Sequence, residues 1–445
     1  MSYKSQNRQV GSLFPELFPY GGKLNEGNKW IRLRNLVPWD ELEEIYRKYF
    51  SDLGRPGKDS DLINGLIIAK HLKEYSDEEV VEEFYENPYL QYFCGYDNFV
   101  TNLEIEASTL SRVRKRLGAK YFRQFEKEIL NILKEKKLIR AKGVMVDATV
   151  FPANLAFPTD TGLIEKARQW TVKIIKQVAK SVGIKIRTYC RVARATFIKF
   201  QRRRQKKTKE ISKANKQMLQ YLRRNIGQLK ELLGEVINFS GFLPDWLKER
   251  FILDRLAVVE NIYRQQWEML KKKTHRVKDR IVSLHRPEVR PIVTGKSGKE
   301  TEFGLKGVVS YVDGYIFLDG CSYDAFNEAK LLPKSLSAYQ KRFGKKPGTI
   351  ILDNLYGNRE NRRLLKELGI RASLIPLGRR EKLKYRYFDW IKKKQRERNR
   401  IEGSIGNGKV NYGLDRLLYK IAGGDEIWVR MGLLGMNLTT ALRRA

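Results

Sequence analysis

The sequence predicts a mixed α/β domain that is interrupted after its first strand by a long helical insertion and is preceded by an all-helical region. Three observations support this prediction. The run from Gly143 to Val150 is short, β-branched and apolar, as expected of a buried strand. Residues 161–280 then return to helical periodicity, and strand-like runs resume only after His285. Strands and helices in this order are typical of a mixed sheet flanked by helices.

The region before the first strand, residues 36–137, is predicted to be helical. Apolar residues recur at helical spacing from Trp39, and a second apolar run follows a break that contains Gly and Pro. Ser76 with Glu79 three residues later predicts a capped helix N-terminus. A basic helix is predicted from Ser108. It either lies in a groove of DNA or is an ordinary helix with a solvated basic face, and the charge pattern leaves both interpretations open.

The second half of the α/β domain begins with a predicted hairpin. Asp313 and Gly314 form a two-residue turn between strand-like runs, and Gly369 follows a helical stretch where a helix C-terminus is expected. The other predicted elements are helices over 328–343, 358–368 and 390–411 and strands over 349–353 and 370–375. We therefore predict a helical domain over 1–140, an α/β domain over 141–160 and 281–445, and a basic helical insertion over 161–280.

The composition predicts a folded protein that binds a polyanion. The chain of 445 residues carries 88 Lys and Arg against 51 Asp and Glu, which gives a formal net charge of +37. Because 42% of its residues are hydrophobic and 11% are aromatic, the chain can bury cores and is not a disordered basic tail. A charge excess of this size is typical of proteins that bind nucleic acid.

Cysteine usage and the N-terminal segment predict a cytoplasmic protein. The three cysteines lie far apart in the chain, so we expect neither a disulfide framework nor a Cys-based zinc site. The N-terminus lacks a basic segment followed by an apolar one, and the sequence contains no apolar run of about eighteen residues. We therefore predict neither secretion nor contact with a membrane.

The strongest local charge bias lies inside the predicted insertion. Residues 171–230 contain nineteen basic residues against one acid, Glu210. A charge run usually marks a solvated face, but the length of this one predicts a footprint for DNA phosphates. Its centre comprises Arg202, Arg203, Arg204, Lys206 and Lys207.

Two carboxylates follow predicted buried strands. Asp147 ends the run Val-Met-Val, and Asp353 ends the run Ile-Ile-Leu. A charge at the edge of an apolar layer is costly unless cations or hydrogen bonds compensate it, and ligands of open α/β sheets gather at the carboxyl ends of strands. Taken singly, each residue is better explained as a turn or a cap. The pair is better explained as part of a site.

Glu402 is a third candidate carboxylate, on a predicted helix. Arg398 and Lys409 lie four residues before it and seven after it, so all three side chains project to a similar side. A surface ion pair between Arg398 and Glu402 explains the spacing equally well. The neighbouring glycines favour the functional interpretation, because small residues let a phosphate backbone approach closely.

Three carboxylates in one strongly basic chain suit metal-assisted phosphodiester chemistry. With only three histidines, any metal site must rest on oxygen ligands, which Mg²⁺ or Mn²⁺ prefers. Two such ions can activate a nucleophile and stabilise the leaving oxygen of a phosphodiester. Arg398 and Lys409 would then hold the flanking phosphates.

The motifs around these residues resemble those of the DDE transposases of prokaryotic insertion sequences, in the superfamily grouped around insertion sequences four and five. The resemblance rests on the Val-Asp-Ala-Thr strand end, on Leu-Asp-Asn-Leu-Tyr-Gly at 352–357, on Arg-Ile-Glu-Gly at 400–403 and on Tyr-Gly-Leu-Asp-Arg at 412–416. It implies a ribonuclease H-like catalytic domain with Asp147, Asp353 and Glu402 as the metal-binding triad. Arg398, Glu402 and Lys409 match the last three members of the family's Tyr, Arg, Glu, Lys signature. The tyrosine's position falls on Gln395.

The resemblance implies a DNA transposase that binds the terminal inverted repeats of its element, cleaves the ends with two Mg²⁺ or Mn²⁺ ions, and joins the 3′ hydroxyls to target DNA. It also implies a homodimer on double-stranded DNA. The N-terminal helices would recognise the ends through Arg112, Arg114, Lys115 and Arg116. Two alternatives remain open at this point: a metal-dependent nuclease without strand transfer, and a non-catalytic DNA-binding protein derived from a transposase.

Overall fold

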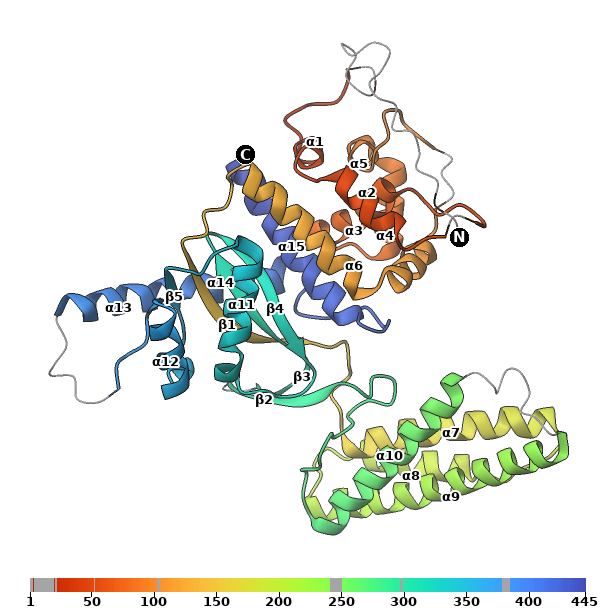
Figure 1. The fold of residues 1–445 in the computed structure, drawn as a ribbon. Coiled ribbons are helices and arrows are strands. Elements are labelled where there is room, and N and C mark those ends of the chain that lie inside the picture. The colour runs from red at the N-terminus through yellow and green to blue at the C-terminus, as the bar shows by residue number, and fades with distance from the viewer. Residues whose placement is uncertain are drawn as a thin grey trace. The chain divides into compact units, whose positions relative to one another are not determined.

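The computed structural model of the protein divides the chain into two compact units (Figure 1). It describes residues 3, 20, 22–51, 53–101, 105–240, 250–296, 299–377 and 385–445. The first unit comprises Met1–Asn154, Leu305–Ser322 and Phe326–Ala445, and the second comprises Leu155–Gly304 and Tyr323–Ala325. The first unit thus holds the N-terminal helices together with most of the sheet.

The N-terminal region is helical, as predicted, and its helices begin at side chains that cap them. Asp59 accepts hydrogen bonds from the first turn of α3, and Asn87 does the same for α5. The predicted capping box of Ser76 and Glu79 is present at the start of α4. The helices are α1 (Lys29–Arg34), α2 (Trp39–Arg47), α3 (Ser60–Lys73), α4 (Asp77–Glu86), α5 (Pro88–Phe93) and α6 (Ala107–Glu135).

Helix α6 changes direction at Gly118, close to its basic first turns. Gly118 has φ 62° and ψ 175°, so the residue leaves the helical region and α6 consists of two helical segments. The first segment carries Arg112 to Arg116 and therefore runs in a different direction from the second. The second segment packs along α15 (Gly424–Arg444).

The sheet is mixed and lies mostly in the first unit. Strand β1 (Gly143–Pro152) pairs in parallel with β5 (Thr349–Ile351), and β5 pairs in parallel with β6 (Arg371–Ala372). On its other side β1 adjoins β3 (Lys299–Val312), which pairs antiparallel with β4 (Tyr315–Ser322). The predicted turn joins β3 to β4, since Asp313 and Gly314 both have positive φ, at 49° and 91°.

Short helices position the segments that follow the strands. Helix η1 (Glu328–Leu331) leads into α11 (Leu332–Phe343), and η2 (Asn354–Tyr356) into α12 (Arg359–Glu367). The single helix predicted over 390–411 is instead two: α13 (Tyr385–Glu397) and α14 (Asn399–Asn411). Arg398 between them keeps helical φ and ψ, and its amide bonds to the carbonyls of both Lys394 and Gln395, so the break is slight. The side chain of Arg398 thereby lies where the two helices meet.

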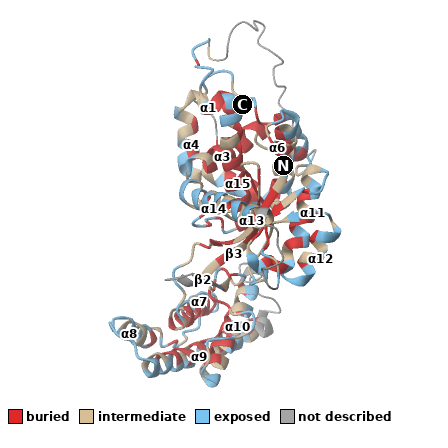
Figure 2. Ribbon diagram, turned by 90° about the vertical axis from the view of Figure 1, so that its left-hand side faces the viewer, coloured by how far each residue is buried: buried red, intermediate tan, exposed pale blue. Residues whose placement is uncertain are grey.

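The C-terminal helix α15 was not among the predicted elements, yet it forms the centre of the first unit. It packs against α3, α6 and β4, and most of its residues are buried (Figure 2). Gly432 permits this burial, because a Cβ there would lie 2.5 Å from Leu414 Cδ2. Since helices and sheet share α15 as common core, the N-terminal region and the sheet form one unit.

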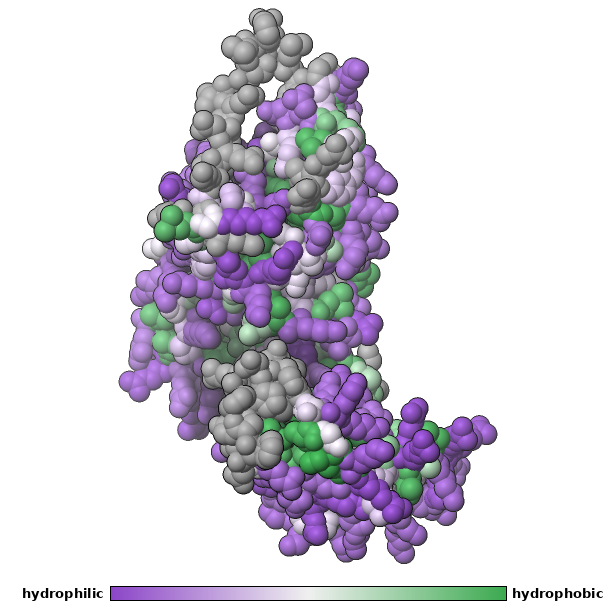
Figure 3. Space-filling model, turned by 90° about the vertical axis from the view of Figure 1, so that its right-hand side faces the viewer, coloured by the Kyte–Doolittle hydropathy of each residue, from purple (hydrophilic) through white to green (hydrophobic). Residues whose placement is uncertain are grey.

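The second unit is the helical insertion and its flanking strand. Its helices are α7 (Asp160–Ser181), α8 (Cys190–Gln201), α9 (Thr208–Ser240) and α10 (Arg250–Lys272), and β2 (Arg290–Lys296) pairs with the first residues of β3. Apolar side chains of α7, α9 and α10 form two buried clusters. On the face drawn in Figure 3, hydrophilic residues cover most of the described surface of both units. No helix in the described ranges is long and apolar enough to cross a membrane.

Candidate active site

Asp147 lies within β1, which continues to Pro152, so this residue does not end its strand as predicted, whereas Asp353 follows the end of β5 and caps η2. Strand β1 pairs with β5 in the register Val144 with Ile350 and Met145 with Ile351. The same offset continued by two residues brings Asp147 level with Asp353. Because β5 is much shorter than β1, the middle of β1 lies beside the carboxyl end of β5, and this is why two residues 206 positions apart in the chain come together.

Glu402 joins them from α14, and one guanidinium touches all three carboxylates. Nη1 of Arg398 lies 3.6 Å from Asp147 Oδ2 and 3.1 Å from Asp353 Oδ2. Nη2 of Arg398 donates to Glu402 Oε1 at 2.5 Å. We call Asp147, Asp353, Glu402 and Arg398 the strand-end site. The structure therefore brings together the three carboxylates and one of the two cations singled out in the sequence.

The three carboxylates differ in their access to water. The side chain of Asp147 is 16% exposed, that of Asp353 is 35% exposed and that of Glu402 is 48% exposed. Burial raises the pKa of Asp147, and the nearby carboxylates of Glu328 and Glu402 add to this, whereas the Ala148 amide and Arg398 oppose it. Asp147 is thus the carboxylate that most needs a compensating cation.

A fourth carboxylate and a buried phenol lie close to the strand-end site, and sequence reasoning assigned neither a role. Glu328 begins η1 and forms an ion pair with Lys306 at 2.8 Å. Burial raises the pKa of Tyr356, and the charges of Glu328, Asp147 and Asp353 raise it further. The Tyr356 hydroxyl is buried and has no hydrogen-bond partner among the described residues. The motif at 352–357 contains Tyr356, so its sequence signal was present.

Gln395, in the position of the family's tyrosine, holds the strand end that precedes Asp353. Its Nε2 donates to the carbonyl of Leu352 at 3.0 Å and to the carbonyl of Ser373 at 2.7 Å. The Ser373 hydroxyl also accepts from the Leu352 amide at 3.2 Å. Gln395 thereby ties α13 to the ends of β5 and β6, three residues before Arg398.

The segment after α14 anchors that helix to the rest of the first unit. The Gly413 amide donates to Glu74 at 2.7 Å, and the Gly413 carbonyl accepts from the indole of Trp428 at 2.6 Å. The Leu417 amide donates to the carbonyl of Pro152, at the end of β1, at 2.8 Å. The motif at 412–416 therefore has a structural role, because it fixes α14 relative to both α15 and β1.

The donor set of the strand-end site fits a hard divalent cation. All its potential ligand atoms are carboxylate oxygens, which Mg²⁺ and Mn²⁺ prefer, and the partly exposed Glu402 leaves room for water ligands. Arg398 now gathers the three groups, and no set of three or more His, Cys, Asp or Glu side chains within the described ranges is arranged as a metal site. The carboxylate oxygens are suitable ligands for a metal ion. In this structure they contact the guanidinium of Arg398 instead.

The predicted DNA contacts on α6 divide into two groups. Arg112, Lys115 and Arg116 are exposed. Arg114 is instead 2% exposed and forms an ion pair with Asp77, beneath the ring of Tyr419 at 4.2 Å. The prediction for Arg114 is corrected accordingly, because a buried side chain that is already paired cannot reach DNA.

The remaining predicted cations are accessible or partly so. Lys409 is half-buried on α14, seven residues after Glu402. The basic cluster of the insertion lies between α8 and α9 and is exposed throughout, with Arg203 paired to Glu210 at 2.5 Å. This cluster belongs to the second unit and comprises Arg202, Arg203, Arg204, Lys206 and Lys207.

Comparison with known proteins matches two segments of the chain to transposase families. Residues 19–116 match a family model described as a transposase domain (DUF772), and residues 350–439 match the transposase DDE domain. The uncharacterized protein ORF8 in the nfe locus of Rhizobium meliloti is 35% identical over 183 residues, which are 40% of this chain and 86% of the relative. No solved structure matches the chain. The two family models cover the N-terminal helices and the segment that carries Asp353, Arg398 and Glu402. The chain therefore belongs to the DDE transposases of the insertion-sequence type.

Proposed function

We propose that this transposase binds the terminal inverted repeats of its element, cleaves DNA at the ends with divalent-metal assistance, and joins the freed 3′ hydroxyls to target DNA. The observation that carries the proposal is the convergence of Asp147, Asp353 and Glu402, from β1, the end of β5 and α14, on the one guanidinium of Arg398. The mixed sheet supports a ribonuclease H-like catalytic domain. Two ends must be paired, so the proposed working form is a homodimer on double-stranded DNA.

Asp147, Asp353 and Glu402 would hold two Mg²⁺ or Mn²⁺ ions. Bound there, the ions would supply activation of the attacking oxygen and stabilisation of the leaving oxygen. The protein itself contributes by fixing the backbone segments that carry the carboxylates. Gln395 holds the backbone before Asp353, and the segment around Gly413 holds α14. Preorganised charges of this kind act strongly because they need no rearrangement during the reaction.

Arg398 has a second proposed role, toward the DNA. Its planar donors fit phosphate oxygens as well as carboxylate oxygens, and it lies within reach of any phosphate brought to the three carboxylates. Lys409 and the cluster from Arg202 to Lys207 would bind phosphates farther from the reacting bond. Contacts of that kind position DNA without reading its sequence, and they weaken steeply with salt.

The test is Asp147→Asn in the full chain, assayed for Mg²⁺-dependent cleavage of DNA that contains the sequences flanking the reading frame. The matched control is Asp389→Asn, which removes an exposed carboxylate on α13. We expect the first variant to lose cleavage but to keep DNA binding, and the control to keep both. Cleavage retained by Asp147→Asn would refute the assigned site.

Strand transfer is tested separately, with a DNA duplex that already carries a 3′ hydroxyl end. Joining of this end to a second duplex supports a transposase, whereas cleavage without joining indicates a nuclease. Titration of Mg²⁺ or Mn²⁺ by calorimetry addresses the non-catalytic alternative. No heat of binding in wild type, or equal heat in Asp147→Asn, would count against metal held by these carboxylates.

A further inference from the structure

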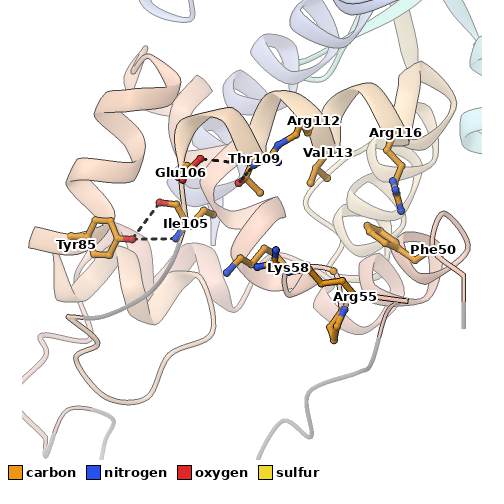
Figure 4. A pocket seen from close by; sticks show the side chains of 12 residues that line it. Phe50, Arg55, Lys58, Tyr85, Ile105, Glu106, Thr109, Arg112, Val113 and Arg116 are labelled. Atoms are coloured by element: carbon orange, nitrogen blue, oxygen red, sulfur yellow. Dashed lines mark hydrogen bonds and ion pairs between the residues drawn. The ribbon is translucent and has the colours of Figure 1, made fainter. Parts of the chain in front are cut away.

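A basic hollow lies beside the first segment of α6, away from the strand-end site. Its volume is about 610 Å³. Arg112 and Arg116 project into it from α6, and Arg55 and Lys58 lie across from them on the segment before α3 (Figure 4). Its other lining residues are Phe50, Pro56, Gly57, Tyr85, Ile105, Glu106, Thr109 and Val113. We call this feature the α6 hollow.

Among the residues that the structure describes, the positive charge of the α6 hollow is largely uncompensated. Four cations line it against one carboxylate, Glu106, whose side chain is 79% exposed and lies 3.9 Å from Arg112. Within the part of the chain that the structure describes, Arg55, Lys58 and Arg116 form no ion pair with a carboxylate. Like charges that converge without counter-charges repel one another, so the arrangement favours an anion.

In a second hollow of the first unit, some of the cations are paired with acids of the same lining. It has about 490 Å³ and is also lined by several cations. There, however, Lys394 pairs with Glu397 at 2.7 Å, and Arg444 pairs with Asp313 at 3.4 Å. Both of these acids line the same hollow. Two of the five cations that line this hollow are thus paired with acids of its own lining, whereas the α6 hollow has a single contact of this kind, between Arg112 and Glu106.

The arginines of the α6 hollow are held in place before any ligand arrives. The Arg112 guanidinium donates to the hydroxyls of Ser108 and Thr109, each at 3.2 Å. The Arg116 guanidinium lies over the ring of Phe50 at 5.1 Å. The α6 N-terminus also faces this hollow through Glu106 and Thr109, and the positive end of its dipole adds to the field. Ordered donors lose less entropy on binding.

We propose that the α6 hollow seats the phosphodiester backbone of duplex DNA and acts as a sequence-independent positioning contact. Its volume exceeds what a lone phosphate needs and accommodates a sugar-phosphate segment, while its apolar walls, such as Val113 and Phe50, suit the sugar. The proposal adds Arg55 and Lys58 to the DNA contacts predicted from the sequence, and it removes the buried Arg114 from them. The inference rests on the proposed function only in taking DNA as the partner.

The test is the double variant Arg55→Ala/Lys58→Ala in the full chain, with the affinity for duplex DNA measured over a range of salt concentrations. Its matched control is Lys120→Ala/Lys127→Ala, which removes the same charge from exposed positions elsewhere on α6. We expect the first variant to bind roughly tenfold more weakly near 0.1 M salt and its log–log salt slope to fall by about one to two. The loss should be equal for element-end DNA and for unrelated duplex.

Three outcomes would overturn the proposal. The first is a salt slope equal to that of the control double variant. The second is a loss confined to element-end DNA, which would indicate base reading. The third is saturable binding of inorganic phosphate that is lost in the variant while DNA affinity is kept, which would indicate a site for a free anion. The proposed function fails on a different measurement, namely cleavage retained by Asp147→Asn, so the two failures are distinguishable.

Discussion

The strand-end site and the α6 hollow carry charges of opposite sign and treat them in opposite ways. In the strand-end site, three carboxylates converge and the single guanidinium of Arg398 contacts all of them. In the α6 hollow, four cations converge, and Glu106 is the one carboxylate among the described residues that line it. Each carboxylate of the first site therefore contacts a cation, whereas three of the four cations of the second form no ion pair with a described carboxylate.

This difference predicts how each region responds to its ligand. Metal ions held by these carboxylates, as proposed, would compete with Arg398, which already contacts all three, so we expect their binding to be coupled to a movement of this side chain. A phosphate at the α6 hollow meets donors that Ser108, Thr109 and Phe50 already hold, so binding there needs little rearrangement. Mutations should therefore affect chemistry at the first region and affinity at the second.

The largest effect is expected at the strand-end site, from Asp353→Asn. Loss of this charge removes one of the three proposed metal ligands, so cleavage should fall by roughly 10³-fold. DNA affinity should stay within about twofold of wild type, since Asp353 is not among the cations that bind phosphate. Rates come from single-turnover cleavage in Mg²⁺, and affinities from binding assays without metal. A parallel fall in both quantities would contradict the separation of the two regions.

Arg114 lies on the same helix as Arg112 and Arg116, but it is buried, and we expect it to stabilise the fold and not to bind DNA. Arg114→Ala leaves half-buried Asp77 with one cation fewer, and loss of this largely buried ion pair should lower the free energy of unfolding by about 3 kcal/mol. Arg112→Ala, at an exposed position, should change it by less than about 0.5 kcal/mol. Urea unfolding of both variants measures the difference. Equal stabilities would show that Arg114 is not structural.

The same ion pair predicts a pH dependence. Burial alone would raise the pKa of Asp77, but the hydrogen bonds and charges of Arg114 and Lys70 hold it below its ordinary value. A lowered pKa means that the folded state binds fewer protons, so this stabilisation is present at neutral pH and is lost as pH falls through that pKa. The difference in unfolding free energy between wild type and Asp77→Asn should thus shrink below about pH 4. Glu82→Gln, exposed on α4, should show no such trend.

Gln395 offers a smaller effect, on stability and cleavage but not on DNA affinity. Gln395→Leu removes the donor that the buried carbonyls of Leu352 and Ser373 share, which should cost about 1–3 kcal/mol of stability. Because Asp353 follows Leu352, the carboxylate should shift and the maximal cleavage rate should fall roughly tenfold, with DNA affinity unchanged. Lys393→Ala, exposed on α13, is the control. An unchanged cleavage rate at reduced stability would make Gln395 a purely structural residue.

Residues at the strand ends could be predicted because their signal is local. An apolar β-branched run that ends in Asp marks Asp147 and Asp353 wherever the rest of the chain goes. The family's spacing marks Arg398 and Glu402. That Arg398 contacts all three carboxylates depends on the β1–β5 register and on the near-continuous join of α13 and α14, which local patterns do not specify.

Arg114 and α15 show two further limits. Arg114 is four residues after buried Leu110, so helical spacing places it on the apolar face, but its charge suggested a surface position. A count of charges along the helix cannot separate the two cases. Helix α15 contains glycines that weaken a helix on propensity alone, and their purpose, such as the close approach of Gly432 to Leu414, depends on tertiary packing.

The smallest effect is expected from Lys115→Ala, and it tests how far the DNA contact extends beyond the α6 hollow. Lys115 is exposed on α6 between Arg114 and Arg116 but does not line the hollow. A point charge on an open surface binds a phosphate weakly, so the salt slope should fall by no more than about one and stability should change by less than about 0.5 kcal/mol. Titration of duplex DNA at several salt concentrations measures this. If Lys115→Ala lowered affinity as much as Arg55→Ala/Lys58→Ala, the contact would be the open face of α6, and the concave site would have no special role.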